Sequence, residues 1–150
     1  MQKVICVFIV LASLLLISIH CQSPSTSKNE TGLRLPDDLE ATLWAESPML
    51  YNPTNMDVDS KGRIWITEAV NYRNFNNDST HFMHHAQGDR VIILEDTDQD
   101  GRADTSLVFV QDTDLVAPLG IAVLGKKIYV SCAPHLIVYT DENGDDKPDH

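Results

Sequence analysis

One motif occurs twice in this chain, and it limits the possible folds more than any other feature of the sequence. The segment Asn55–Thr67 aligns with Leu119–Ser131 without a gap. Each copy contains two alternating apolar segments joined by a turn with glycine, which is Gly62 in the first copy and Gly125 in the second. Glycine readily adopts the positive φ that tight turns between strands require. The sequence therefore predicts the same β-hairpin twice.

A second repeated motif follows each hairpin, and it is an acidic turn. Leu94–Asp104 aligns with Tyr139–Asp149, and the two turns begin 45 positions apart, at Asp96 and Asp141. A period of this length is typical of a four-stranded propeller blade. The hairpins are 64 positions apart, so the first repeat carries 19 additional residues, which we expect between about 69 and 89.

The pattern along the rest of the chain is that of an all-β protein. From residue 39 onward, short apolar or alternating segments are separated by Gly, Asn and Asp, and no long segment has the helical period. The sequence predicts about two blades of a β-propeller, with a small sandwich of about eight strands as the alternative fold. The predicted strands are Glu40–Ala45, Asn55–Asp59, Arg63–Glu68, Arg90–Glu95, Ser106–Gln111, Gly120–Leu124, Lys127–Cys132 and Leu136–Thr140.

Two blades do not close a propeller, which typically has about 4 to 8 of them, each burying its apolar faces against its neighbours. The sequence stops at His150, within the second acidic turn and one strand before the second blade would be complete. We therefore expect residues 37–150 to be the N-terminal part of a propeller domain, from a longer protein or a truncated gene. Its missing C-terminal blades would be needed to close the ring.

The N-terminus has the features of an export signal. A single basic residue, Lys3, precedes 16 uncharged residues, Val4–Ile19, a length that is short for a bilayer span. The residues around Cys21 resemble a bacterial lipobox. We expect residues 1–20 to be a lipoprotein signal peptide, Cys21 to carry the lipid and residues 21–36 to form a polar tether. A plain secreted protein and an uncleaved anchor are the alternatives.

This interpretation predicts an exported protein, held at a membrane of the cell envelope by its N-terminal lipid and facing the periplasm or the cell surface. Its charge is strongly negative, with 22 Asp and Glu against 11 Lys and Arg. We expect no nucleic-acid partner, because neutralising phosphates needs a basic face. Cys132 is expected to be a small core residue on a strand and not a nucleophile.

The acidic turns carry the residue types that Ca²⁺ prefers. In the first turn, oxygen ligands recur at alternate positions with Gly101 at the bend, which suits a hard cation. In the second turn Asp146 replaces that glycine, which predicts a weaker site. The alternative is that Asp and Asn serve only the geometry of two solvated turns. The predicted ligands are Asp96, Asp98, Asp100 and Asp104 in the first turn, and Asp141, Asn143, Asp145 and Asp149 in the second.

Four polar residues at and after the end of the Trp65 strand are candidates for the central funnel of a propeller, where ligands commonly bind. They are Glu68, Asn71, Tyr72 and Arg73. A buried ion pair between Glu68 and an arginine is the alternative interpretation.

Three stretches, Leu39–Pro48, Asn52–Glu68 and Gly88–Asp104, together resemble a known family, and the last of them is the most specific. They look like the N-terminus of bacterial membrane-bound dehydrogenase-like propellers, which are relatives of the soluble quinoprotein glucose and sorbosone dehydrogenases. The resemblance covers nearly the whole chain after the signal peptide. It implies a six-bladed, TolB-like propeller in which the strand near Glu40–Ala45 completes the last blade.

The resemblance also implies a function. The complete protein would oxidise a sugar or polyol with pyrroloquinoline quinone in its funnel, although no catalytic residue of the family matches a position here. No haem is expected in this chain, because it has no Cys-x-x-Cys-His. One hypothesis is that the chain is the N-terminal part of a cell-envelope sugar or polyol dehydrogenase and is inactive alone. A second is that it belongs to a non-catalytic, Ca²⁺-stabilised propeller that binds glycans or a protein. A third is that it is the product of a pseudogene.

Overall fold

The computed structural model of the chain describes residues 32–72 and 85–150, and within these residues it is all-β, as predicted. Seven of the eight predicted strands are present there, and their ends lie within two residues of the predicted positions. They are β1 (Pro53–Val58), β2 (Ile64–Glu68), β3 (Asp89–Glu95), β4 (Thr105–Asp112), β5 (Gly120–Leu124), β6 (Lys127–Cys132) and β7 (His135–Thr140).

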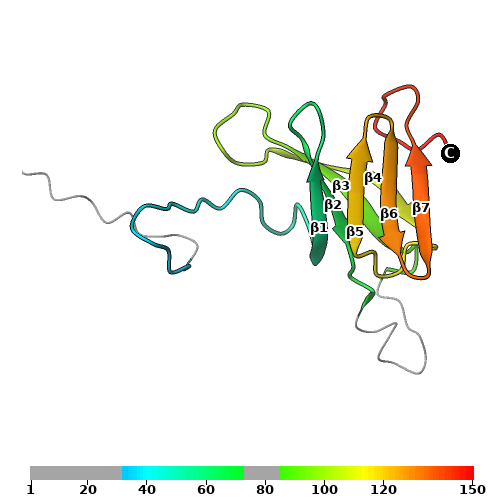
Figure 1. Ribbon diagram of the computed structural model, residues 1–150, viewed down its shortest axis with the longest axis horizontal. Helices are drawn as coiled ribbons and strands as arrows, with labels where there is room; N and C mark the ends of the chain where they lie inside the picture. Colours follow the sequence, from blue (N-terminus) through cyan, green and yellow to red (C-terminus); the bar gives the residue numbers. More distant parts are fainter. Residues whose placement is uncertain (1–31, 73–84) are drawn as a thin grey trace, which may run out of the picture.

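The strands form two antiparallel sheets in which each strand is bonded to the next along the chain (Figure 1). The first sheet has the order β1-β2-β3-β4, and the second has the order β5-β6-β7. Equivalent strands pair in equivalent register, since Ile64 lies opposite Leu94 in the first sheet and Ile128 lies opposite Tyr139 in the second. The predicted alignment of the repeats is therefore confirmed for these strands.

The additional residues of the first repeat lie between its second and third strands, where the repeat spacing predicts them. Residues 69–88 connect β2 to β3, whereas only Ala133 and Pro134 connect β6 to β7. Asn71 closes the base of the longer connection, because its side chain accepts a hydrogen bond from His85 N at 2.9 Å and donates one to His85 O at 3.1 Å.

The prediction of a strand at Glu40–Ala45 is wrong, because these residues have no regular secondary structure. A strand needs a partner backbone along its length. Here the contact is a backbone hydrogen bond from Ala103 N to Trp44 O at 2.8 Å, outside any ladder. The apolar side chains of this part of the chain lie instead on the first sheet.

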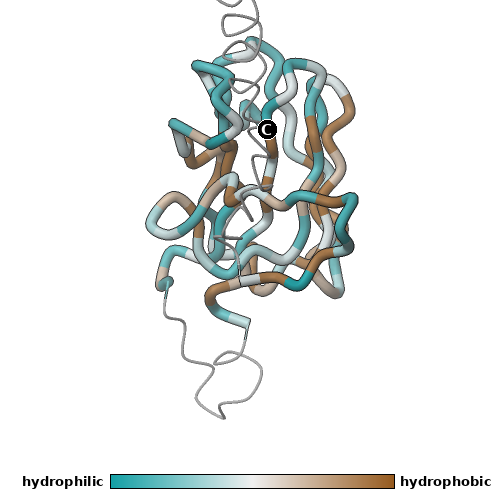
Figure 2. Tube along the Cα trace, turned by 90° about the vertical axis from the view of Figure 1, so that its left-hand side faces the viewer, coloured by the Kyte–Doolittle hydropathy of each residue, from teal (hydrophilic) through white to brown (hydrophobic). Residues whose placement is uncertain are grey.

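The main hydrophobic core lies between the two sheets. Its centre is formed by Trp65 and Phe109 of the first sheet, whose rings meet edge to face with centroids 4.9 Å apart. Cys132 on β6 is buried in the same core, as predicted. Figure 2 shows the hydrophobic segments following the strands of both sheets, with hydrophilic residues in the turns at their ends.

Equivalent residues of the two sheets point to opposite sides of this interface. Trp65 of the first sheet points into the core, whereas its repeat equivalent, Tyr129, lies on the other face of the second sheet. Ile128 and Val130 of the second sheet point into the core, whereas their equivalents in the first sheet, Ile64 and Ile66, belong to a separate cluster on its outer face. Each sheet therefore has two different apolar faces, and the interface joins one face of each kind.

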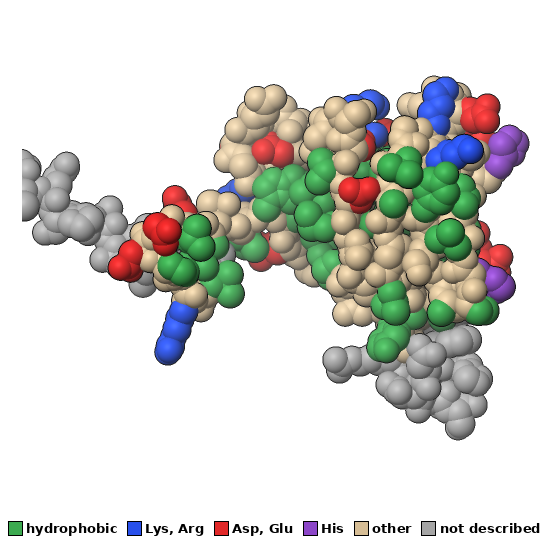
Figure 3. Space-filling model, viewed as in Figure 1, with side chains coloured by type: hydrophobic (Ala, Val, Ile, Leu, Met, Phe, Trp, Pro, Cys, Tyr) green, Lys and Arg blue, Asp and Glu red, His purple; other side chains and the backbone are tan. Residues whose placement is uncertain are grey.

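Both outer faces carry apolar side chains. On the first sheet, Ile66, Ile92 and Leu94 are buried under Trp44, Ala45, Met49 and Leu50 of the preceding segment. On the second sheet, Leu136 is 66% exposed and Val138 is 42% exposed. Hydrophobic side chains are visible over β5, β6 and β7 on this face in Figure 3. The first sheet is thus covered by its own chain, and the second sheet is open.

Within residues 32–72 and 85–150, the structure contains no helix of the length and apolar character needed to cross a membrane.

Candidate functional site

The first acidic turn, Asp96–Asp104, connects β3 to β4 and is held by hydrogen bonds from its own backbone to its carboxylates. Asp104 Oδ2 accepts bonds from Thr97 N and Thr97 Oγ1, both at 2.7 Å. These bonds, from the hydroxyl and then the backbone of Thr97, hold the pKa of Asp104 below its ordinary value. Gly101 N donates to Asp96 Oδ2 at 3.0 Å. The turn is therefore closed by hydrogen bonds to the carboxylates of Asp96 and Asp104.

Three of the four predicted ligands in this turn come together. One carboxylate oxygen each from Asp96, Asp98 and Asp104 lies within 4.8 Å of the others. Asp100 is not part of this group, and its Oδ1 accepts a hydrogen bond from Arg102 N at 2.8 Å. Within the described residues, Asp96 Oδ1 is buried and has no hydrogen-bond partner. Three converging carboxylates with an unused oxygen fit a hard cation such as Ca²⁺.

The second acidic turn, Asp141–Asp149, follows β7 and has the same backbone design. Its positive φ angles fall at Gly144 and Asp146, the equivalents of Gln99 and Gly101 in the first turn. Glu142 N donates to Asp149 Oδ2 at 2.7 Å, as Thr97 N does to Asp104. The repeat is therefore present at the level of individual hydrogen bonds.

The carboxylates of the second turn are used differently. Asp141 is 8% exposed, and both of its oxygens accept backbone bonds, Oδ1 from Gly144 N at 2.7 Å and Oδ2 from Asp146 N at 3.1 Å. In the part of the chain that the structure describes, the carboxylates of Asp145 and Asp149 do not converge with Asp141 as the first set does. The second turn satisfies its acidic groups internally and offers a poorer cation site.

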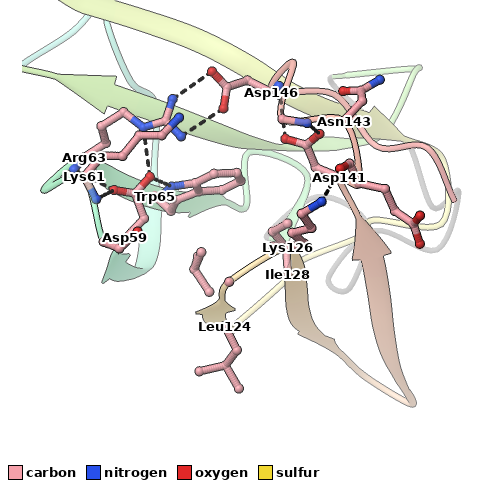
Figure 4. Close-up of a pocket in the computed structure, with 15 residues that line it drawn as sticks. Asp59, Lys61, Arg63, Trp65, Leu124, Lys126, Ile128, Asp141, Asn143 and Asp146 are labelled. Atoms are coloured by element: carbon pink, nitrogen blue, oxygen red, sulfur yellow. Dashed lines mark hydrogen bonds and ion pairs between the residues drawn. The ribbon is translucent and has the colours of Figure 1, made fainter.

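Asp146 ties the second turn to the first sheet. Its carboxylate accepts two bonds from the Arg63 guanidinium, from Nη1 at 2.7 Å and from Nη2 at 2.9 Å. Arg63 Nε donates to Asp59 Oδ2 at 2.8 Å, and Trp65 Nε1 donates to the same oxygen at 3.0 Å. Arg63 therefore bridges a carboxylate of the β1–β2 turn and a carboxylate of the second acidic turn (Figure 4).

The pKa values agree with this bridge. The paired Arg63 guanidinium lowers the pKa of Asp146, against an opposing effect of burial. Burial raises the pKa of Asp59, but the hydrogen bonds from Trp65 and Arg63 outweigh it and the net shift is downward. The pKa of Arg63 is raised, chiefly by its bonds to Asp146. All three groups are thus held in their charged forms.

A pocket of about 490 Å³ lies beside this bridge, between the two sheets at their turn end (Figure 4). Its walls come from the β1–β2 turn, the β5–β6 turn and the second acidic turn. Trp65 and Ile128 give it an apolar floor, and Lys126 donates a hydrogen bond across one wall to Glu142 O. The carboxylates of Asp59, Asp141 and Asp146 in its walls accept hydrogen bonds from Arg63 or from backbone amides, so the pocket is a cleft with polar walls between the sheets.

The candidate funnel residues lie at the opposite end of β2, and two of them are fully buried. Glu68 Oε2 accepts a bond from Arg90 Nε at 2.6 Å, and its Oε1 accepts one from Tyr51 N at 2.6 Å. Asn71 is held by His85, as described above. Tyr72 is 44% exposed. The geometry of Glu68 matches the buried ion pair that was the alternative interpretation of this residue.

Sequence reasoning missed the Arg63 bridge. Arg63 and Asp146 are 83 positions apart and belong to different repeats. The signal that could have identified the bridge is Asp146 itself, since an acidic residue at the bend, where the first turn has Gly101, needs a reason to adopt a positive φ of 62°. The predictions for the signal peptide, the lipid on Cys21 and funnel residue Arg73 lie outside the described residues.

The family model of a domain of unknown function, DUF7133, matches residues 24–150. No curated protein and no solved structure matches the chain.

Proposed function

We propose that this chain, which belongs to the DUF7133 family, forms two consecutive blades of an exported β-propeller. In this proposal the first acidic turn holds a structural Ca²⁺ ion, and the propeller is a binding scaffold for a glycan or a protein at the cell envelope.

The arrangement of the sheet faces carries the proposal. In a propeller each blade is related to the next by rotation, so one face of every blade meets the opposite face of its neighbour. Here Trp65 of the first sheet meets Ile128 and Val130 of the second, while Tyr129, the equivalent of Trp65, points away. A pair of sheets related by a two-fold axis would bury equivalent residues together. This observation favours blades over the sandwich alternative.

The connection between the sheets supports the same interpretation. The chain leaves the first sheet from β4 and enters the second at β5, which lies beside β1 at the opposite edge of the first sheet. There Val123 N donates to Asp57 Oδ2 at 2.7 Å, and Thr54 Oγ1 donates to Pro118 O at 2.6 Å. In a propeller, the chain likewise passes from the outer strand of one blade to the inner strand of the next.

The Ca²⁺ part of the proposal rests on the first acidic turn. Asp96, Asp98 and Asp104 would hold the ion, because their oxygens converge and one oxygen of Asp96 is unused. Like charges this close repel one another unless a cation lies between them. A bound ion would therefore stabilise the connection between β3 and β4.

Isothermal titration calorimetry of the full chain with CaCl₂, followed by thermal unfolding with Ca²⁺ and with chelator, tests this proposal. We expect one bound ion and a higher midpoint of unfolding with Ca²⁺, because a ligand that binds only the folded state stabilises it. The matched variants are Asp98→Asn in the first turn, which should reduce the stabilisation by Ca²⁺, and Asp145→Asn in the second, which should keep it in full. Absence of binding heat in the unaltered chain would contradict the proposal.

Pyrroloquinoline quinone, which the resemblance implies, does not fit Glu68 and Asn71, two of the residues that were candidates for the funnel. The carboxylate of Glu68 is fully buried and occupied by Arg90 and Tyr51 N, and the amide of Asn71 is occupied by His85. Neither offers a polar atom to a cofactor. We therefore assign no cofactor-binding role to these residues, and oxidation of a sugar or polyol remains an expectation from the resemblance alone.

A further inference from the structure

The outer edge of the second sheet is open along β7, whereas the same edge of the first sheet carries a fourth strand. Among the described residues, the sheet order places β7 beside β6 alone, while its repeat equivalent, β3, lies between β2 and β4 (Figure 1). The end of the second acidic turn already lies on this edge. Thr140 N donates to His150 O at 3.0 Å, and Asp149 N donates to Thr140 O at 2.7 Å. In the first sheet, Asp104 N makes the equivalent bond to Glu95 O at 2.8 Å, so His150 lies where β4 would begin.

The rest of β7 directs further backbone groups to the open edge. In an antiparallel sheet, the N–H and C=O groups of alternate residues point to opposite neighbours. Because Thr140 bonds to His150, the backbone groups of Val138 and Leu136 also point away from β6. A strand that lay antiparallel beside β7 would pair with these groups, as β4 pairs with β3.

Residues 136–140 have none of the features by which proteins protect an edge strand, which are bulges, charged side chains and proline. Their sequence is Leu-Ile-Val-Tyr-Thr, and their ladder with β6 is regular. By contrast, the edge strand of the first sheet, β4, is irregular opposite Val91 and Ile92 and ends in Asp112. The edge of β7 is therefore suited to pairing and that of β4 is not.

The core between the two sheets is also incomplete at this edge. Phe109 of β4 meets Tyr139 of β7 edge to face, with ring centroids 6.3 Å apart. Leu107 of β4 lies opposite the core residue Ile93, and therefore on the same face, yet it is 44% exposed. A strand added to β7 would continue this interface on the side of β4 and bury further apolar surface.

The surroundings of the edge define the chemistry of the strand that fits it. The middle of the strand would be apolar, like Leu107–Val110 of β4, because it would continue the apolar interface. Its N-terminal end would lie beside the second acidic turn, where Glu142, Asp145 and Asp149 are exposed. A basic residue at that end would complement this charge.

We infer that the edge of β7 is a docking site for one extended segment of a partner protein, which joins the second sheet as an antiparallel fourth strand. The segment is apolar in its middle and basic at its N-terminal end. The inference rests on the binding-scaffold part of the proposed function and names the class of partner. It does not involve the carboxylates of the first acidic turn.

A fluorescent synthetic peptide, with two lysines followed by the sequence of residues 105–112, tests this inference. Its fluorescence anisotropy, measured with the full chain, should show saturable binding of one peptide per chain. Amide exchange of Leu136 and Val138, followed by NMR, should slow by up to about 100-fold when the peptide is at 100 times its dissociation constant. Absence of binding, or binding that leaves these two amides unprotected, would overturn the inference.

Two N-methylated peptides are matched controls that leave the chain unaltered. Leu107 lies opposite Ile93, the equivalent of Val138, so its N–H points to the neighbouring strand and that of Val108 points away. Methylation of the peptide nitrogen at the position of Leu107 should abolish binding, and methylation at the position of Val108 should retain it. Equal effects of the two would show that the peptide does not bind as a strand.

Two variants of the chain locate the site. Val138→Pro removes an N–H that faces the open edge and leaves the ladder with β6 intact, so it should abolish binding while circular dichroism shows an unchanged fold. Leu124→Ser, on β5 at the other side of the same sheet, is the control and should bind normally. Loss of binding in Leu124→Ser would place the peptide on the open face and overturn the inference.

Two further measurements separate the other outcomes. A dimer of the chain alone in sedimentation, with Leu136 and Val138 protected from exchange, would overturn the inference, because a second copy would then occupy the edge. Calorimetry with CaCl₂ on the same sample separates this site from the Ca²⁺ part of the proposed function. Binding heat without peptide binding would overturn the strand site alone, whereas peptide binding without heat would support the strand site and contradict the Ca²⁺ site.

Discussion

The two acidic turns have the same backbone and opposite means of balancing charge. In the first, three carboxylates converge and one oxygen of Asp96 has no partner among the described residues. In the second, backbone amides occupy both oxygens of Asp141, and Arg63 occupies Asp146. In the proposal above, the first turn binds an external cation, whereas the charge of the second turn is balanced by the side chain of Arg63. The repeated sequence motif thus determines the backbone geometry of the turn. One or two residues that differ between the copies determine which positive group balances its charge.

The largest effect should come from removing the Arg63 side chain, which balances the negative charge of the second turn. Arg63→Ala should lower the free energy of unfolding by about 3 kcal/mol, because it leaves the carboxylates of Asp59 and Asp146 without their partner in a largely buried position. Urea unfolding measures this loss. Lys127→Ala is the matched control, because Lys127 aligns with Arg63 in the repeat and is exposed, so it should change stability by less than about 0.5 kcal/mol. Equal losses in the two variants would contradict the bridge.

Removing the other half of the bridge should have a smaller effect that depends on pH. Asp146→Asn should cost about 2 kcal/mol at neutral pH, because Arg63 then loses its charged partner. Arg63 holds the pKa of Asp146 below 3.8, so the stabilisation is complete above that value and is lost as the pH falls through the lowered pKa. The stabilities of the two proteins should therefore converge as the pH falls below the lowered pKa. A difference that stayed constant over this range would show that the carboxylate charge does not matter.

Exchanging one residue between the turns tests their difference as cation sites. Asp98→Asn should weaken Ca²⁺ binding on the order of 10-fold, since it removes one of three charged ligands. The reciprocal change, Asn143→Asp, should not create a second site, because the oxygens of Asp141 are already occupied by backbone amides. Calorimetry should give one ion per chain for the unaltered protein and for Asn143→Asp. Two ions per chain in either protein would remove the distinction between the turns.

The smallest effect concerns backbone conformation. Gln99 has a φ of 62°, at the position where the second turn has Gly144 with a φ of 78°. Gln99→Gly should therefore stabilise the protein by up to about 1 kcal/mol, and Gly144→Gln should destabilise it by a similar amount. Thermal unfolding of the pair measures both changes. Effects of the same sign in the two turns would show that their backbones are not equivalent.

Much of the fold could be predicted from the sequence because its signals are local. The strands β5 and β6 begin and end at the predicted residues, since their alternation is bounded by glycine and by a two-residue turn. The spacing of the repeats also located the additional residues between β2 and β3. The segment Glu40–Ala45 shows where local signals fail, because its alternation says nothing about whether a partner strand lies beside it.

The candidate site was predictable only within each turn. The alternation of aspartates identified Asp96, Asp98 and Asp104, because ligands that close a single turn are near one another in sequence. It did not exclude Asp100, whose carboxylate does not converge with the other three. The Arg63 bridge required knowledge of how the two sheets face each other, which no local pattern contains.

The unequal faces of the sheets have a consequence for self-association. A surface that binds the same surface on a second copy produces a symmetric dimer, to which no further unit is added. A surface that binds a different surface on the next copy allows a further unit to be added at each end. The open face of the second sheet, with Leu136 and Val138, is of the kind that meets a face like that of Ile64 and Ile66. Units joined in this head-to-tail manner form a closed ring when the rotation between them returns to its start, and an open fibre when it does not. The angle between two neighbouring sheets therefore determines whether the assembly is a closed ring or an open fibre.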